Sequence, residues 1–268
     1  MRFRDALRGD GLTAIAEVKR RSPSAGDLRP GADPADVVAG FERAGAAAVS
    51  VLVDERFDGS LDDLRAARAA TSLPILGKGF FNDADDFVRL KDAGADAALI
   101  LLRDVDDERA RELMRVAEEV GLDTLVEAHT ADELDRAVAL GADPIGVNAR
   151  DLSTFQIDRR AQLRLVAGAP RDRVVVAESG IESRGQAAAA ELAGANAILV
   201  GSTLMRAEDP AAKLRELLAR PLVKVCGLTR QEDVDAAVDA GADLVGFILA
   251  AETTRRAPGV LDVPDEVL

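Results

Sequence analysis

Short apolar runs alternate with amphipathic helical patterns along the first 220 residues of the chain. The runs are continuous rather than alternating, which is typical of parallel strands covered on both faces. Eight of them occur, at residues 12–18, 47–53, 74–78, 97–102, 123–126, 144–147, 173–177 and 197–200. The helical patterns that follow lie at residues 34–44, 61–71, 84–93, 106–120, 131–140, 159–167, 184–192 and 210–219.

A repeated Gly-Ala phrase, usually followed by Asp or Asn, marks the ends of several of these helices. Its glycines are Gly45, Gly94, Gly141, Gly194 and Gly241, spaced 49, 47, 53 and 47 residues apart. Glycine just past a helix can adopt the left-handed conformation that closes the last turn. Each interval holds about two strand-helix units, so the chain is predicted to be an α/β protein with a (β/α)8 TIM barrel. Its 268 residues suffice for such a barrel.

The pattern continues past the eighth helix. A ninth strand is predicted at residues 222–225, a helix from residue 231 and a tenth strand at residues 244–249. We therefore divide the chain into a barrel domain, residues 1–220, and a β-α-β fragment, residues 221–268, that resembles the start of a second barrel. Its unpaired strand edges predict sensitivity to proteases after about Arg220. Residues 22–31 form a Gly- and Pro-containing loop and are a candidate lid over the barrel mouth.

Composition narrows the function classes. The net charge of −14 argues against a nucleic-acid or anionic-membrane surface. One cysteine and one histidine can form neither an intrachain disulfide nor a zinc site. No dinucleotide or Walker-type glycine loop calls for NAD or ATP. There is no signal-peptide pattern and no apolar run of about 20 residues. We therefore expect a cytoplasmic monomer without metal or cofactor, acting on a small molecule.

Polar residues gather where the predicted strands end, which is where active sites of such barrels lie. They are Glu17, Lys19, Lys78, Glu127, Asn148, Arg150 and Glu178. The chain has 29 arginines but only five lysines, so Lys19 and Lys78 stand out. A buried lysine can lose its proton, whereas arginine effectively cannot. Any one of these groups could be an ordinary surface charge, but together they predict acid–base chemistry at one mouth.

Small residues follow the seventh and eighth predicted strands. They are Ser179 and Gly180 after one strand, and Gly201 and Ser202 after the next. Free backbone N–H groups beside helix starts at this point of the barrel are a usual phosphate site. Simple turn glycines are the alternative interpretation.

These positions carry a resemblance to the indole-3-glycerol phosphate synthase family. The matching segments are Ile-Ala-Glu-Val-Lys-Arg-Arg-Ser-Pro-Ser at 15–24, Phe-Asp-Gly-Ser-Leu at 57–61, Pro-Ile-Leu-Gly-Lys at 74–78, Leu-Val-Glu-Ala-His at 125–129, Ile-Gly-Val-Asn-Ala-Arg-Asp-Leu at 145–152, Val-Ala-Glu-Ser-Gly-Ile at 176–181 and Val-Gly-Ser-Thr-Leu-Met at 200–205. The resemblance spans residues 12 to about 219 and touches most strand ends.

The resemblance implies a cofactor-free reaction of tryptophan biosynthesis. In it, 1-(2-carboxyphenylamino)-1-deoxyribulose 5-phosphate closes a ring and loses CO2 and water. Lys78 would protonate the carbonyl, and Glu127 would act as acid and base in the later steps. Lys19 would hold the carboxylate and assist dehydration. The supporting residues implied are Glu17 and Glu178 for tuning the lysines, Asn148, Arg150, Ser22, Phe80 and Leu152 for substrate positioning, and Ser179, Gly180, Gly201 and Ser202 for the phosphate.

The chain departs from the family pattern in three places. Only about a dozen residues precede the first strand, where the family has some tens that help to cover the site. Gly79 stands where the family commonly has Asp, so a carboxylate beside Lys78 is missing or comes from another residue such as Asp83. The usual Gly-Gly-Ser after the second strand is Asp-Gly-Ser at residues 58–60.

The tail has a resemblance of its own, to the start of phosphoribosylanthranilate isomerase. It is carried by Val-Lys-Val-Cys-Gly-Leu-Thr-Arg at residues 223–230, by residues 240–247 and by Thr-Arg-Arg at 254–256. That enzyme catalyses the preceding step and is fused to the synthase in some organisms. Cys226 would match its general base, although a small apolar core residue is the simpler interpretation. We expect this fragment of a bifunctional gene product to be inactive.

Two other functions stay open at this stage. The isomerase could be the main activity, which would need the rest of the second barrel. Alternatively, the barrel could bind a phosphate ligand without catalysis, as the short N-terminal segment and Gly79 would allow. An active synthase is the leading hypothesis.

Overall fold

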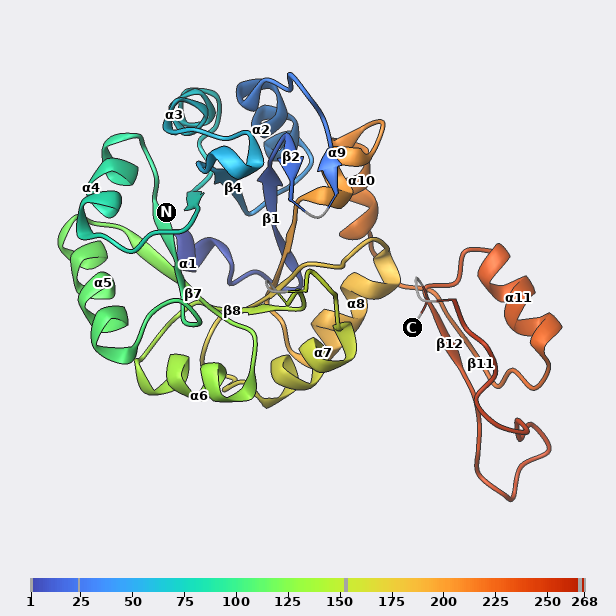
Figure 1. The fold of residues 1–268 in the computed structure, drawn as a ribbon. Coiled ribbons are helices and arrows are strands. Elements are labelled where there is room, and N and C mark those ends of the chain that lie inside the picture. Colours follow the sequence, from blue (N-terminus) through green and yellow to red (C-terminus); the bar gives the residue numbers. More distant parts are fainter. Residues whose placement is uncertain (1, 24, 152–153, 265–266, 268) are drawn as a thin grey trace.

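Eight parallel strands close into a barrel in the computed structural model, which describes residues 2–23, 25–151, 154–264 and 267 (Figure 1). The strands are β1 (Thr13–Val18), β4 (Ala48–Leu52), β5 (Ile75–Lys78), β6 (Ala97–Leu101), β7 (Asp123–Ala128), β8 (Ile145–Asn148), β9 (Val175–Glu178) and β10 (Ala197–Val200). They pair in chain order, and β10 closes the ring against β1. The predicted barrel is confirmed, with each strand end within two residues of its apolar run.

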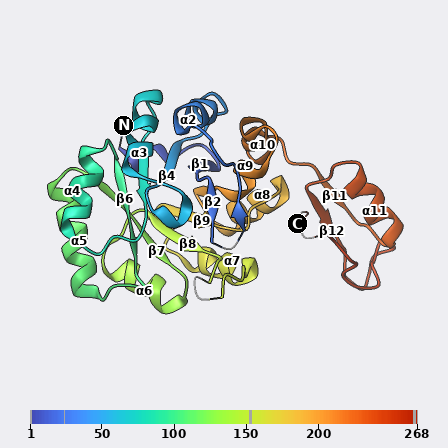
Figure 2. The same cartoon turned by 45° about the horizontal axis from the view of Figure 1, so that its top comes forward.

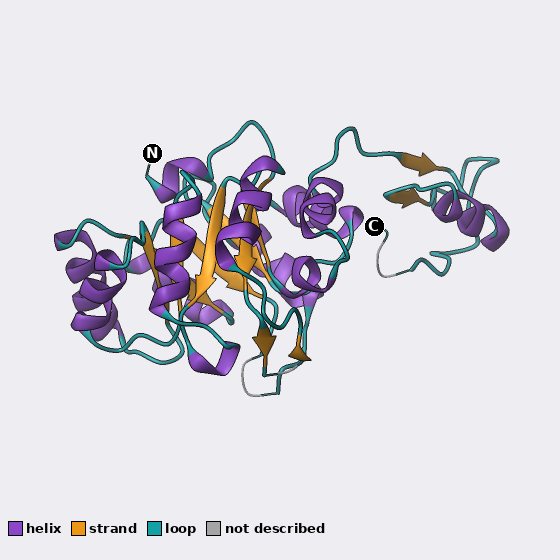
Figure 3. Ribbon diagram, turned by 90° about the horizontal axis from the view of Figure 1, so that it is seen from above, coloured by secondary structure: helices purple, strands orange, loops and turns teal. Residues whose placement is uncertain are grey.

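Helices surround the strands on the outside, and the strands occupy the centre of the molecule (Figure 3). They are α2 (Pro34–Arg43), α3 (Leu61–Ala70), α4 (Ala84–Asp92), α5 (Asp107–Glu119), α6 (Ala131–Ala139), α7 (Arg159–Gly168), α8 (Arg184–Ala193) and α10 (Pro210–Leu217). All five glycines of the Gly-Ala phrase have positive φ, from 78° at Gly141 to 118° at Gly194. The left-handed helix ends expected from the phrase are therefore confirmed.

Five short elements were not predicted. They are helix α1 (Phe3–Ala6), strands β2 (Arg21–Ser22) and β3 (Gly26–Asp27), the 3-10 turn η1 (Glu55–Phe57) and helix α9 (Ser202–Arg206). Strands β2 and β3 form an antiparallel ribbon inside the segment expected to be an irregular lid. The ribbon packs beside η1, and its Ser22 lines the cavity at the barrel mouth. Elements of two to five residues are too short for a period in the sequence to reveal.

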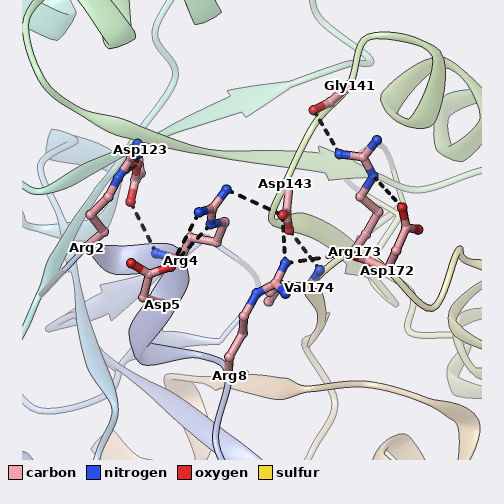
Figure 4. A network of polar contacts seen from close by, with 10 residues as sticks. All are labelled: Arg2, Arg4, Asp5, Arg8, Asp123, Gly141, Asp143, Asp172, Arg173 and Val174. Atoms are coloured by element: carbon pink, nitrogen blue, oxygen red, sulfur yellow. Dashed lines mark hydrogen bonds and ion pairs between the residues drawn. The ribbon is translucent and has the colours of Figure 1, made fainter.

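Helix α1 closes the opposite end of the barrel, where the strands begin (Figure 4). Phe3 is fully buried among the inward-facing side chains of the strands. The backbone N–H of Arg4 donates to Asp123 Oδ2 at 3.2 Å, and Arg8 Nη2 donates to Asp143 Oδ2 at 2.9 Å. The residues before β1 therefore plug the base of the barrel, away from the mouth.

The tail forms a small separate unit beside the barrel (Figure 2). It contains β11 (Lys224–Cys226), α11 (Gln231–Asp239) and β12 (Leu244–Gly246), and the two strands form a parallel pair. The second strand is shorter than the predicted run to residue 249. Arg184 on α8 forms an ion pair with Asp243, which also accepts the backbone N–H of Val223 at 2.7 Å.

Candidate active site

A cavity of about 780 Å³ opens at the carboxyl ends of the barrel strands. Twelve residues expected from the sequence line it: Glu17, Lys19, Ser22, Lys78, Phe80, Glu127, Asn148, Arg150, Ser179, Gly180, Gly201 and Ser202. Glu178 lies below the cavity floor and is fully buried. Leu152 lies outside the described residues. Cys226 is exposed on the tail and does not line this cavity. Side chains from seven different strands or their loops thus meet at one mouth.

Lys78 is at the centre of three buried carboxylates. Its Nζ atom lies 2.5 Å from Glu178 Oε2, 3.5 Å from Glu127 Oε2 and 3.8 Å from Glu17 Oε2. Each glutamate ends or nearly ends a different strand, so the barrel geometry rather than chain proximity brings them together. Burial disfavours the ammonium form, but the three carboxylates outweigh this and raise the pKa of Lys78 above its ordinary value.

Lys19 forms a second pair with Glu17, at 2.7 Å between Nζ and Oε1. The two residues are two apart on β1 and its end, so their side chains leave the strand on the same side. Burial would raise the pKa of Glu17, but Lys19 and then Lys78 lower it. Gly201 makes room for this pair, because a Cβ atom there would lie 2.3 Å from Glu17 Oε1.

Glu127 is held from the other side by β8. Asn148 Nδ2 donates to Glu127 Oε1 at 2.9 Å, and Asn148 Oδ1 accepts the backbone N–H of Arg150 at 2.9 Å. Burial would raise the pKa of Glu127, but Lys78, His129 and Asn148 lower it to about 2. Burial and the nearby Glu127 carboxylate instead raise the pKa of Glu178 to about 8. Two carboxyls on one lysine are thus tuned in opposite directions, as acid–base sites require.

Two carboxylate oxygens in this cluster are left without a hydrogen bond from any described residue. They are Glu127 Oε2 and Glu178 Oε1, and both are fully buried. Buried acceptors are normally satisfied, because leaving one unpaired costs about 1–3 kcal/mol. The two carboxyl groups also interact with each other, and this contact helps to raise the pKa of Glu178.

The loops after β9 and β10 form the small-residue part of the cavity. Ser179 and Gly180 both have positive φ, 70° and 69°. Thr203 Oγ1 on α9 donates to the carbonyl oxygen of Ile181 at 2.8 Å and so ties the two loops together. A non-glycine residue at positive φ is strained, so it keeps this conformation only where the surrounding structure holds it there. The two loops line the same cavity, and the phosphate site expected there from the sequence stays a prediction.

An aromatic wall faces this part of the cavity. The Phe80 ring stacks on Phe57 with 6.4 Å between ring centroids, and the Arg56 guanidinium carbon lies 3.8 Å from the Phe80 centroid. Sequence reasoning gave Phe80 a role but missed Phe57 and Arg56, which lie on the unpredicted turn η1. A flat apolar wall of this kind suits an aromatic ring in the ligand.

The structure explains one departure from the family and corrects one expectation. A Cβ atom at Gly79 would lie 2.8 Å from the Phe81 ring, so the ring fills the space that a side chain at 79 would need. Asp83 does not replace the missing carboxylate. It precedes α4, its side chain is 82% exposed, and it contacts Arg109 at 3.5 Å. Lys78 obtains its carboxylates from β1, β7 and β9 instead.

The described ranges contain no group of three or more His, Cys, Asp or Glu residues able to hold a metal ion. The three glutamates at the barrel mouth surround the ammonium group of Lys78 instead. No helix among the described residues has the length and apolar character needed to cross a membrane.

Two residues with roles in this geometry had no assignment from the sequence. His129 lies beside Glu127, with 3.2 Å between Nε2 and Glu127 Oε1. Gly146 on β8 lies under Glu178, and a Cβ atom there would be 2.2 Å from Glu178 Oε1. Side chains alternate along a strand, so residues 127 and 129 lie on the same side of β7. This alternation could have predicted that His129 lies beside Glu127. Gly146 gave no such signal, because its role depends on a neighbouring strand.

Comparison with known proteins agrees with this geometry. The profile of the family described as "Indole-3-glycerol phosphate synthase" matches residues 1–217. The chain is 48% identical over 214 residues to the indole-3-glycerol phosphate synthase of Leifsonia xyli, covering 79% of this chain and 82% of that protein. It is 44% identical to the Mycobacterium avium protein of the same name, covering 80% and 79%.

Solved structures share the fold at low sequence identity. The 3-hexulose-6-phosphate synthase of Salmonella typhimurium superposes with a TM-score of 0.61 at 18% identity, covering 77% of this chain and 96% of that one. A chain of the tryptophan synthase complex of Pyrococcus furiosus gives 0.60 at 19% identity, covering 78% and 98%. These two similarities concern the barrel alone.

Proposed function

The chain belongs to the indole-3-glycerol phosphate synthase family, and we propose that the lysine–glutamate cluster at its barrel mouth carries out the ring closure. The substrate is 1-(2-carboxyphenylamino)-1-deoxyribulose 5-phosphate. It has an anionic end at the phosphate, another at the ring carboxylate, and a carbonyl between them. The cavity offers small-residue loops at Ser179 and Ser202, the cation Lys19 beside Gly201, and the ammonium group of Lys78.

Each step of the reaction has a group in place. Lys78 gives a proton to the carbonyl oxygen as the ring carbon attacks it, so that no free alkoxide forms. Loss of CO2 then restores the aromatic ring. Glu127 serves the later proton transfers: it protonates the hydroxyl that leaves as water, while the amine left on Lys78 takes the C–H proton. Lys19, held by Glu17, binds the carboxylate, and Phe80 lies against the aromatic ring.

The observation that carries this proposal is the placement of Lys78 Nζ within 3.8 Å of three buried carboxylates from separate strands. The pKa of Lys78 and those of Glu127 and Glu178 are all shifted there, which is typical of groups that carry out acid–base chemistry.

Substitution of the two central groups tests the proposal. We expect Lys78→Met and Glu127→Gln each to lower kcat on the order of 10²–10⁴-fold, the usual contribution of a positioned acid or base. The measurement is indole-ring fluorescence during turnover, with low background because the chain has no Trp or Tyr. Far-ultraviolet circular dichroism shows whether the fold is kept. Near-normal rates in both variants would contradict the assignment, and tight product binding without turnover by the unmodified chain would favour a non-catalytic barrel.

For the tail we infer an origin in a bifunctional synthase–isomerase gene. The support is the motif around Cys226 together with the parallel β11-α11-β12 unit. Cys226 is exposed and lines neither the cavity at the barrel mouth nor the cavity of about 1440 Å³ beside it. We therefore assign the activity of this chain to the first barrel.

A further inference from the structure

A second cavity, of about 1440 Å³, lies beside the barrel mouth and is lined by His129 and Glu133 but not by Glu127. The two cavities share the lining residues Arg103, Asn148, Arg150, Ile157, Gly180 and Glu182. The reaction cavity is lined by Glu127 but by neither of those two residues. The His129 imidazole therefore stands in the wall between the two spaces. Its side chain is 11% exposed, compared with 2% for Glu127 and 16% for Glu133.

The contacts of the imidazole run from one cavity to the other. Its Nε2 atom lies 3.2 Å from Glu127 Oε1, and its Nδ1 atom lies 3.4 Å from Glu133 Oε2. Glu133 is fixed at the start of α6, because its Oε2 atom accepts the backbone N–H of His129 at 2.7 Å and its own N–H donates to Thr130 Oγ1 at 3.2 Å. Neither ring nitrogen forms a hydrogen bond of good geometry within the described part of the chain.

The proposed reaction has a proton balance that this arrangement fits. One proton goes to the carbonyl oxygen and one to the departing hydroxyl, while one is removed from carbon. The substrate carboxylate leaves as neutral CO2. Each turnover therefore consumes one net proton from solvent. The groups that deliver it are buried, and a substrate that fills the reaction cavity covers their access from the mouth.

We propose that His129 supplies this proton to Glu127 from the outer cavity; the inference rests on the proposed function. Glu127 gives its proton to the departing hydroxyl, which leaves as water, and the neutral amine of Lys78 takes the C–H proton and so recovers the one it gave to the carbonyl oxygen. Glu127 is then the group left one proton short. The resulting carboxylate takes a replacement proton at Oε1 from Nε2 of the imidazolium. The imidazole regains a proton at Nδ1 from Glu133 or from water in the outer cavity. His129 acts through Glu127 and does not touch the substrate.

The charges around His129 favour its protonated form. Burial would lower its pKa, but Glu127, Glu133 and, further away, Glu178 raise it above the ordinary value. Arg103 and Asn148 also line the outer cavity beside the ring, and Lys78 lies on the far side of Glu127. A proton shared by the two groups is therefore held more strongly by the imidazole than by Glu127. A substrate with two anionic ends raises the proton affinity of Glu127 and so promotes transfer to it.

The test compares His129→Gln with the unmodified chain across pH 6–9 in H2O and D2O. Because the imidazolium is the active form, kcat of the unmodified chain should fall as pH rises through the imidazole pKa. In the variant we expect kcat to be lower by about tenfold or more, KM to stay within about twofold, and this basic limb to be absent. The solvent isotope effect on kcat should increase, because proton supply becomes rate-limiting.

Three further variants separate a proton supply from mere packing. Added imidazole should restore kcat of His129→Ala in proportion to its protonated fraction. Glu133→Gln keeps the acceptor for the His129 N–H and should lose less activity, because water can still reach Nδ1. Glu108→Gln, an exposed change on α5, is the matched control and should behave as the unmodified chain.

Two results would overturn the inference. One is a His129→Gln variant with normal kcat and an unchanged pH profile. The other is a loss of activity that keeps the basic limb and is not restored by imidazole, which would indicate a structural role. Failure of the proposed function looks different, because the unmodified chain would then show no turnover at all.

Discussion

Single residues in the mouth decide how far each carboxylate can approach Lys78. Glu178 reaches it at 2.5 Å only because the residue beneath, Gly146, has no side chain. Gln162 holds the same strand from the outside, through a hydrogen bond of 2.6 Å from Nε2 to the carbonyl oxygen of Glu178. The position of one proton-carrying group therefore depends on a glycine and an amide that never contact the substrate.

The substitution Gly146→Ala tests this dependence. Its Cβ atom would lie 2.2 Å from Glu178 Oε1, so the carboxylate must move away from Lys78. We expect kcat to fall about tenfold or more, with a loss of about 1–3 kcal/mol in the free energy of unfolding from overpacking. Gly168→Ala is the control, because nothing lies within 4 Å of its Cβ position. Steady-state kinetics and urea unfolding measure both effects, and a Gly146→Ala variant with normal kcat would refute the steric argument.

Helices and strands were predicted best where a hydrophobic pattern repeats along the sequence. The eight strands and their helices followed from apolar runs, and the polar strand ends placed most of the mouth residues. The ribbon β2–β3 and turn η1 were missed, because they are shorter than any period. The partners of Lys78 could be expected at one mouth, but which carboxylate lies nearest depends on strand register and on Gly146. Asp83, suggested by proximity in sequence, lies on the outside.

The short helix α1 shows how an unpredicted element contributes to stability. Its Phe3 side chain is fully buried at the base of the barrel, far from the mouth. We expect Phe3→Ala to lower the free energy of unfolding by about 3 kcal/mol, the usual cost of truncating a buried aromatic residue. Both kcat and KM should stay normal well below the unfolding temperature. Val88→Ala, at a side chain that is 42% exposed, is the control. Equal urea midpoints for the two variants would show that α1 is not an integral plug.

At the scale of the whole molecule, the barrel and the tail differ in how much they bury. The barrel strands and helices enclose two extended apolar clusters. In the described part of the tail, the buried apolar side chains are Val234, Ala237, Ala242 and Ala257. Burial of so few apolar side chains offsets only a small part of the conformational entropy that about 40 residues lose when they fold. The tail should therefore open locally much more often than the barrel.

Limited trypsin digestion of the intact chain tests this difference. Cleavage should begin in the tail, at Arg230, Arg255 or Arg256, because these arginines are exposed and the tail is expected to open locally. The tail contacts the barrel through the Arg184–Asp243 ion pair. Synthase turnover should survive the cleavage, since none of the tail residues that the structure describes lines the reaction cavity. The intact chain should not isomerise phosphoribosylanthranilate. Uniform protection of the tail in hydrogen exchange would contradict the first expectation, and loss of synthase turnover on cleavage would show that the tail supports the barrel mouth.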